Sequence, residues 1–191
     1  MRLFVAVDIS DDTRRAFRDV REQLEPHLHR ARHPPRVVWI KDDAAHVTVR
    51  FIGAVADGRV RAIEAALHEP IEIAPFVLEW SIVSTFPSGR SPRVVWLGAT
   101  NDLEPIRQLA TLVNARLDAL VGAGESRPLT PHLTLARIKE PGRGVAWAQA
   151  LAGVKTTPTL SRIDHVTLYE SQTGPKGSTY TVRMRTPLKA R

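Results

Sequence analysis

His46-Val47-Thr48-Val49 recurs in the second half of the chain as His132-Leu133-Thr134-Leu135, so the sequence carries two copies of one alternating tetrad. Successive side chains of an extended strand point to opposite faces. Each copy therefore places an imidazole and a hydroxyl side by side on one face and two aliphatic residues on the other. Two such strands facing each other would supply a general base, a general acid and two hydroxyl donors for phosphate oxygens. These groups suit phosphodiester chemistry without a metal ion.

A third match, His165-Val166-Thr167-Leu168, shows that the tetrad alone does not identify the facing pair. Alternation of polar and aliphatic residues is also what half-buried strands prefer for structural reasons. Spacing along the chain does not fix which strands lie opposite each other. The residues that flank the tetrads have to decide between the copies.

The flanking residues form a recognisable set. The segments are Arg2-Leu-Phe-Val-Ala-Val-Asp8, His46-Val-Thr-Val-Arg-Phe-Ile-Gly53, Arg127-Pro-Leu-Thr-Pro-His-Leu-Thr-Leu-Ala-Arg137, and Val166-Thr-Leu-Tyr-Glu-Ser171 with Tyr180-Thr181. In this combination the chain resembles the 2H phosphoesterase superfamily, from residue 2 to about residue 188. Within the superfamily it is most similar to the prokaryotic RNA 2′,3′-cyclic phosphodiesterases, also called 2′-5′ RNA ligases.

The resemblance implies a fold and a set of site residues. The fold is α+β and bilobal, the LigT-like fold, with two pseudo-symmetric lobes of mainly antiparallel sheet, outer helices and a central cleft. Residues 1–191 then form a single domain. The resemblance makes His46 and His132 the catalytic pair and His165 an incidental third copy. The residues that it assigns to the substrate phosphate are Thr48, Thr134 and Arg137.

Two arginines near the tetrads raise a question of strand geometry. Strict alternation puts Arg137 on the face opposite His132, so Arg137 can bind phosphate only if the strand ends, bulges or twists before it. Arg50 has the parity of His46 and is either a second phosphate ligand or a solvated arginine at the rim of the cleft. The sequence leaves both questions open.

Three further residues are candidates of lower weight. Tyr169 either stacks on a base of single-stranded RNA or packs in the core, and core packing is the commoner role. His29 and His33 have a spacing that can bind a metal on a helix. Because no carboxylate or other ligand accompanies them, a surface helix end is the expected setting. We therefore predict neither a metal nor another cofactor.

Length, composition and charge limit the class of protein. A chain of 191 residues suffices for one well-buried domain, and 43% hydrophobic with 25% charged residues is typical of globular proteins. The net charge of +7 and the pI near 10.5 favour a polyanionic partner. Most of the positively charged residues are arginine, in a chain rich in alanine and proline. This composition is common to soluble proteins encoded by GC-rich genomes, whatever their function. The charge thus supports the functional interpretation of the tetrads, but it does not establish a nucleic-acid partner by itself.

The absence of cysteine excludes disulfides, thiolate chemistry and cysteine zinc sites. The apolar run at residues 3–7 is too short for the core of a signal peptide, and no segment approaches the length of a membrane span. We expect a cytoplasmic monomer without membrane contact. By the resemblance, its partner is RNA that ends in a 2′,3′-cyclic phosphate.

Hydrophobic periodicity predicts strands and helices in the order of an α+β fold with mainly antiparallel sheets. Helices are expected from the Ser10 cap to about residue 29 and over residues 57–67, 103–121 and 145–151. Strands are expected over residues 3–7, 37–40, 47–52, 76–85, 93–97, 132–138, 160–169 and 178–184. Two similar halves, each with one catalytic tetrad, would form the two lobes.

The resemblance implies hydrolysis of the cyclic phosphate to a 2′-phosphate, with His46 as the acid and His132 as the base. The same site, working in reverse on a 5′-hydroxyl RNA, would make a 2′-5′ linkage. That joining would not use ATP, since the sequence has neither a phosphate-binding loop nor a nucleotidyl-transfer motif. Two alternatives remain: a 2H enzyme for a small cyclic nucleotide or another cyclic phosphodiester, and a non-catalytic protein that binds RNA ends.

Overall fold

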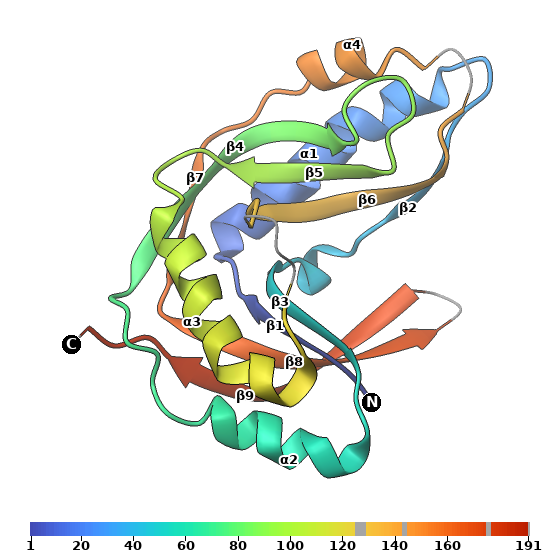
Figure 1. The fold of residues 1–191 in the computed structure, drawn as a ribbon. Helices are drawn as coiled ribbons and strands as arrows, with labels where there is room; N and C mark the ends of the chain where they lie inside the picture. Colours follow the sequence, from blue (N-terminus) through green and yellow to red (C-terminus); the bar gives the residue numbers. More distant parts are fainter. Residues whose placement is uncertain (125–128, 143–144, 175–176, 191) are drawn as a thin grey trace.

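The computed structural model describes residues 1–124, 129–142, 145–174 and 177–190, and its strands form two antiparallel sheets (Figure 1). The four-stranded sheet consists of β1 (Arg2–Val7), β3 (Val47–Ala54), β8 (His165–Gly174) and β9 (Gly177–Pro187), in the order β3-β1-β8-β9. The five-stranded sheet consists of β2 (Arg36–Trp39), β4 (Phe76–Phe86), β5 (Val94–Ala99), β6 (His132–Glu140) and β7 (Thr159–Ile163), in the order β2-β6-β5-β4-β7. The predicted α+β class and the antiparallel pairing are confirmed.

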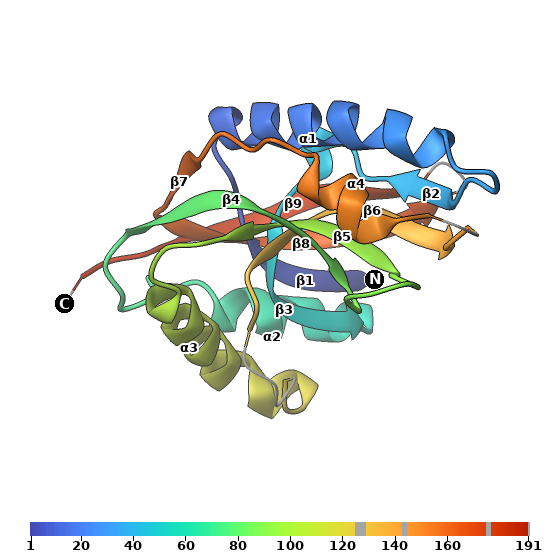
Figure 2. The same ribbon diagram turned by 90° about the horizontal axis from the view of Figure 1, so that it is seen from above.

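The helices of the described residues are α1 (Asp11–His29), α2 (Asp57–Ala66), α3 (Glu104–Val121), α4 (Trp147–Ala152) and the short 3₁₀ helix η1 (Asp42–Ala44). α1 begins where predicted, because the Ser10 hydroxyl accepts a hydrogen bond from the Thr13 backbone N–H at 3.2 Å. α1 packs against β7 and α3 packs against β3. The two long helices therefore lie on opposite sides of the strands (Figure 2).

The two lobes are not the two halves of the sequence. β2, from the first half, pairs with β6 in the five-stranded sheet, whereas β8 and β9 return from the C-terminal part to the four-stranded sheet. The segment 160–169, expected as one strand, is two strands that belong to different sheets and meet at Asp164. Ile163 and Val166 are both buried on either side of it. Because no glycine or proline marks a turn at this point, the sequence did not reveal the passage of the chain from one lobe to the other.

One continuous apolar core joins the sheets and the helices. β3 and β6, the strands of the two predicted catalytic tetrads, lie near each other although they belong to different sheets. No helix in the described part of the chain is both long and apolar enough to cross a membrane. The fold thus positions the tetrads where the two sheets approach each other.

Candidate active site

His46 precedes β3 and is held by its backbone and by aromatic rings. Its Nδ1–H donates to the Ala44 carbonyl oxygen at 2.8 Å. The imidazole stacks on Phe4 with the ring centroids 4.7 Å apart and meets the ring of Tyr180 edge-on at 5.0 Å. Because the carbonyl can only accept, the bonded Nδ1 is the protonated nitrogen of the neutral ring. Nε2 is left as the reactive atom, and it makes no hydrogen bond within the described residues.

His132 at the start of β6 has the same arrangement. Its Nδ1–H donates to the Thr130 carbonyl oxygen, again at 2.8 Å. The ring meets Phe86 edge-on at 5.2 Å and lies 6.2 Å from Trp96. In both tetrads the histidine is thus fixed by the carbonyl two residues before it. Both imidazoles present an Nε2 that accepts no hydrogen bond from the described part of the chain.

The pKa values of His46 and His132 are both lowered from the ordinary histidine value, chiefly because burial disfavours the imidazolium. The guanidinium of Arg137 contributes in the same direction to both, so Arg137 lies within electrostatic reach of both rings. The Asp8 carboxylate opposes these effects at His46 and raises its pKa. The two histidines therefore share a cation, but a carboxylate assists only the charged form of His46.

A β-bulge in β6 determines the face of the strand on which Arg137 lies. Thr134 pairs with Trp96 and Arg137 pairs with Val94, and Leu135 is the extra residue between them. Trp96 and Val94 are two apart on β5 and share a face, so Thr134 and Arg137 share a face as well. The predicted condition for Arg137 is met, because the bulge returns its side chain to the side of the tetrad. Arg137 is exposed and forms no ion pair with any described residue.

A bulge at the corresponding position of β3 has the opposite consequence for Arg50. Thr48 pairs with Ala6 and Arg50 with Val5, so Val49 is the extra residue. Ala6 and Val5 are neighbours on β1 and point to opposite faces, which carries Arg50 away from the face of Thr48. The prediction that Arg50 lies beside the first tetrad, as a phosphate ligand or a solvated arginine, is therefore wrong.

Arg50 is instead a buried structural residue, with 5% of its surface exposed. Its guanidinium donates to the Asn114 side-chain oxygen at 3.0 Å and to the Gly122 carbonyl at 2.5 Å, and it pairs with Asp118 at 3.0 Å. All three partners belong to the C-terminal part of α3 or follow it directly. Arg50 thus fastens β3 to α3 through its two terminal nitrogens, whereas its buried Nε has no hydrogen-bond partner among the described residues.

The hydroxyls of Thr48 and Thr134 lie half-buried on the tetrad faces. Neither makes a hydrogen bond within the residues that the structure describes, so both can donate to a ligand. The predicted site residues therefore present polar groups without a partner among the described residues, and Arg137 lies within electrostatic reach of both histidines. These polar groups are the Nε2 atoms of His46 and His132, the hydroxyls of Thr48 and Thr134, and the guanidinium of Arg137.

The third tetrad surrounds a carboxylate instead of joining the other two. His165 and Thr167 both donate to Asp8 Oδ2, at 3.1 and 2.8 Å, and the Tyr169 hydroxyl donates to Oδ1. The Tyr169 ring stacks on Phe4 with centroids 5.2 Å apart, in agreement with the packing role expected for it. The sequence had marked His165 as incidental and had given Asp8 no role. The sequence did contain a signal for the position of Asp8. Asp8 has the same parity as Phe4, so alternation along β1 places both side chains on one face of the sheet.

His29 and His33 do not share a helix, since α1 ends at His29 and both side chains are exposed. No group of three or more potential metal-binding side chains occurs among the described residues. A hollow of ≈ 510 Å³ opens beside His46 instead and is lined by aromatic and charged side chains. It is bordered by Asp8, Arg14, Asp43, His46, His165, Tyr169, Tyr180, Val182 and Arg185, with Ala44 and Ala45.

Comparisons with known proteins agree with this geometry. The family model of the 2′-5′ RNA ligase superfamily matches residues 11–175. A protein of Archaeoglobus fulgidus named RNA 2′,3′-cyclic phosphodiesterase is 34% identical over 76% of this chain and 77% of its own length. A protein of the same name from Methanothermobacter thermautotrophicus is 28% identical over 95% of both chains.

Solved structures show the same fold. A crystal structure of a Thermus thermophilus protein covers 100% of this chain and 99% of its own, with a TM-score of 0.78 and 25% identity. The apo form of Escherichia coli LigT covers 98% of this chain and 96% of its own, with a TM-score of 0.71 and 26% identity. The bilobal LigT-like fold is thereby confirmed, and this chain belongs to the 2′-5′ RNA ligase superfamily, a group of 2H phosphoesterases.

Proposed function

We propose that this protein hydrolyses the 2′,3′-cyclic phosphate at the end of an RNA and leaves a 2′-phosphate. Both curated relatives described above carry the name of this activity. One observation in the site supports the proposal above all others. Two imidazoles, each fixed through Nδ1, present a free Nε2 within electrostatic reach of one exposed arginine. Two proton-transfer groups beside a phosphate-binding cation are what the reaction requires.

In the proposed mechanism, Nε2 of neutral His132 removes a proton from water as the water oxygen attacks phosphorus. The bond from phosphorus to the ribose 3′-oxygen breaks, and protonated His46 donates its Nε2 proton to that oxygen. The products are a 2′-phosphate and a 3′-hydroxyl, and the two histidines have exchanged protonation states. Solvent restores both before the next turnover.

The remaining site residues act on the phosphate. Arg137 is placed to bind non-bridging oxygens and to stabilise the negative charge that increases as water attacks. Thr48 and Thr134 each add a hydroxyl donor, one from each lobe. None of these steps calls for a metal ion or a nucleotide cofactor.

The same site supports a second reaction, the ATP-independent formation of a 2′-5′ linkage. The nucleophile is then the 5′-hydroxyl of a second RNA in place of water, and the strained ring of the cyclic phosphate supplies the driving force. The family name is compatible with this activity. We further propose that the protein works as a cytoplasmic monomer on RNA substrates, as its basic charge favours.

The test uses an RNA oligonucleotide that ends in a 2′,3′-cyclic phosphate, incubated with the protein in excess EDTA. We expect conversion to a 2′-phosphate end, identified by mass spectrometry and by resistance to a 3′-phosphate-specific phosphatase. The double variant His46→Ala/His132→Ala is the control for contaminating nucleases. Activity that disappears in EDTA and returns with a divalent ion contradicts the metal-free mechanism.

A parallel assay with 2′,3′-cyclic AMP separates RNA from small cyclic substrates. A clearly larger kcat/KM for the oligonucleotide supports the RNA substrate, whereas equal or smaller values favour the 2H enzyme for small cyclic phosphodiesters. A protein that binds RNA ends without catalysis would convert neither substrate.

A further inference from the structure

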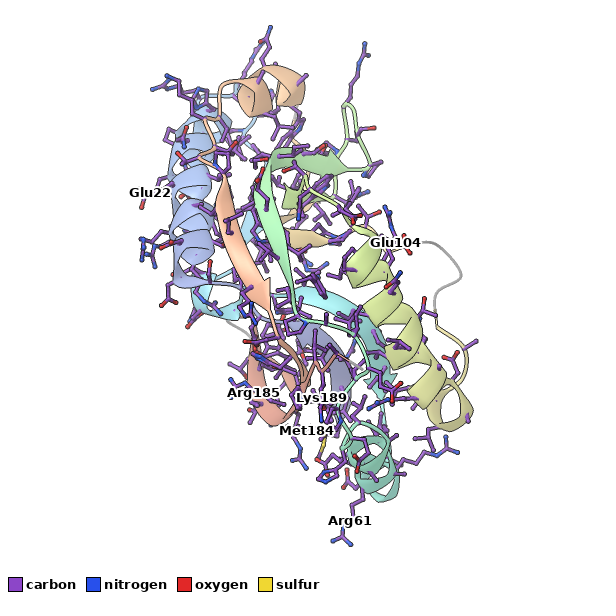
Figure 3. All side chains as sticks on the ribbon, turned by 90° about the vertical axis from the view of Figure 1, so that its left-hand side faces the viewer. Glu22, Arg61, Glu104, Met184, Arg185 and Lys189 are labelled. Carbon is purple, nitrogen blue, oxygen red and sulfur yellow. The ribbon has the colours of Figure 1, made fainter. Side chains whose placement is uncertain are left out.

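The third His-x-Thr copy leads to Asp8, a residue to which the proposed mechanism gives no role. Alternation along β8 puts His165, Thr167 and Tyr169 on one face, and all three side chains donate to the Asp8 carboxylate. Arg185 on β9 adds a cation, with its Nε 3.9 Å from Asp8 Oδ2. Figure 3 shows Arg185 on the lobe of the four-stranded sheet. Asp8 thus accepts three side-chain hydrogen bonds and lies near the guanidinium of Arg185.

These interactions keep Asp8 ionised and hold its side chain in position. Although burial opposes ionisation, the hydrogen bonds from His165, Tyr169 and Thr167 together hold the pKa of Asp8 well below its usual value. The bond to Asp8 likewise raises the pKa of His165. Asp8 therefore remains a carboxylate at every pH at which the histidines titrate.

The fixed charge borders the same hollow as His46. His46 stacks on Phe4, Phe4 stacks on Tyr169, and Tyr169 binds Asp8, so the aromatic rings set the carboxylate and the imidazole in one assembly. His132 lies in the other lobe and does not border this hollow. The carboxylate thus distinguishes two histidines whose backbone settings are otherwise equivalent.

Several other ionisable groups face His46 and have to be weighed with Asp8. Arg14 of α1 and Arg137 of β6 lower its pKa, and Asp8 raises it. The remaining ionisable groups at the hollow are Asp43 from η1, His165 and Tyr169 from β8, and Tyr180 and Arg185 from β9. Burial and the two arginines disfavour the His46 imidazolium, whereas the Asp8 charge favours it.

We propose that the third His-x-Thr copy is the holder of Asp8, and that Asp8 is a positioning residue whose negative charge selects His46, not His132, as the proton donor to the leaving oxygen. This inference rests on the proposed function, because it assigns a direction to that reaction. Asp8 takes no proton itself, since its oxygens already accept from three donors. It acts only through its field on His46.

The first test measures the imidazole pKa values by NMR titration of the ring resonances, in the wild type and in Asp8→Asn. We expect the pKa of His46 to fall by at least about half a unit when the charge is removed, and that of His132 to move far less. Asp164→Asn is the matched control. It removes the other carboxylate that binds His165, at 2.6 Å, but Asp164 does not border the hollow.

Equal shifts for His46 in Asp8→Asn and Asp164→Asn, or no shift in either, would overturn the inference. If Asp8→Asn does not fold, Asp8→Ser removes the same charge with a smaller side chain that still accepts hydrogen bonds. Asp8→Glu restores the charge and should return the pKa of His46 toward the wild-type value. These titrations need no substrate, so they decide the role of Asp8 even if the proposed reaction fails.

The second test asks whether Asp8 acts on proton donation. The two substrates are 2′,3′-cyclic AMP, whose leaving 3′-oxygen needs a proton, and 3′-deoxyadenosine 2′-(p-nitrophenyl phosphate), whose phenolate leaves without one. Asp8→Asn should lower kcat several-fold, up to about tenfold, on the first substrate and much less on the second. A merely structural loss would lower both rates equally and would overturn the assignment. Wild-type protein inactive on both substrates would refute the proposed function instead.

Discussion

β3 and β6 are alike up to the threonine of the tetrad and differ directly after it. In both, the histidine binds the carbonyl two residues earlier at 2.8 Å, and the strand bulges at the residue that follows the threonine. The position after the bulge is buried and the next one returns to the tetrad face. β3 has Arg50 and Phe51 at these two positions, and β6 has Ala136 and Arg137.

The difference shows that the position of an arginine relative to the bulge decides its role in these strands. An arginine directly after the bulge is buried, and one at the next position lies on the tetrad face. Arg50 occupies the buried position and needs a set of partners on α3, whereas Ala136 occupies it without polar contacts. Arg137 occupies the tetrad-face position, where β3 has Phe51, an aromatic side chain that is 57% exposed. One lobe therefore has an arginine at the tetrad-face position after the bulge, and the other lobe has an exposed aromatic ring at the corresponding position.

The largest expected effects test the equivalence of the two histidines. His46→Ala and His132→Ala should each lower the turnover of 2′,3′-cyclic AMP by at least ~10²-fold, the usual scale for a positioned proton-transfer group. On the p-nitrophenyl substrate described above, only His46→Ala should regain activity, because only the acid becomes dispensable. Recovery of His132→Ala instead would reverse the assignment of acid and base. His165→Ala is the reference variant, and a loss as large as that of the other two would refute the choice of catalytic pair.

The next effect concerns the face on which Arg137 lies. Arg137→Lys keeps the charge but loses the two-pronged guanidinium, and Arg137→Ala loses both. We expect kcat/KM to fall from Arg to Lys to Ala, by about 10- to 100-fold in all, because the cation acts on charge that develops at the phosphate. Steady-state kinetics of the three proteins at one pH provide the measurement. Wild-type kinetics in Arg137→Ala would show that the bulge does not direct this side chain to the substrate.

How much of this site the sequence could predict depends on the range of the interactions involved. Local periodicity located the helices and most strands, since both depend on neighbouring residues. The bulge at Leu135 is fixed by pairing with β5, so the sequence could state only that Arg137 requires a bulge. Two consecutive apolar residues, Leu135 and Ala136, were a visible hint. In β3 the polar Arg50 removed that hint and suggested an unbroken alternation.

Local sequence patterns likewise could not predict which strand belongs to which lobe. β7 and β8 follow each other with only Asp164 between them and without a turn signal, yet they belong to different sheets. The third tetrad shows the same limit, because its pattern is indistinguishable from that of the other two. Only the fold reveals that His165 and Thr167 meet the end of β1, at Asp8, and not another tetrad.

A smaller effect is expected in the pH dependence, where the two lobes act together. The reaction needs one neutral and one charged imidazole, so kcat/KM is maximal midway between the two pKa values of the free enzyme. Since burial lowers the pKa of both His46 and His132, this maximum should lie below about pH 6.5, the ordinary histidine value. Above it, kcat/KM falls as the remaining imidazolium loses its proton. Initial rates from pH 4.5 to 9 would show this, and a flat profile with rate-limiting chemistry would contradict paired histidine catalysis.

The smallest effect on catalysis is expected from Arg50, the arginine that the bulge turns away from the site. Arg50→Ala leaves Asp118 and Asn114 without their cation and should lower the free energy of unfolding by about 2 kcal/mol, measured by urea denaturation. The exposure of Asp118, 43% of its side chain, keeps this cost below that of a fully buried pair. Per folded molecule, kcat/KM should remain within about twofold of the wild type, since the guanidinium of Arg50 binds α3 on the side away from the tetrad face. Arg137→Ala should show the reverse, a loss of kcat/KM with little loss of stability, because Arg137 is exposed and unpaired among the described residues. If both variants lost activity in proportion to stability, the bulges would not separate structure from catalysis, and the contrast between β3 and β6 would be a difference of packing alone.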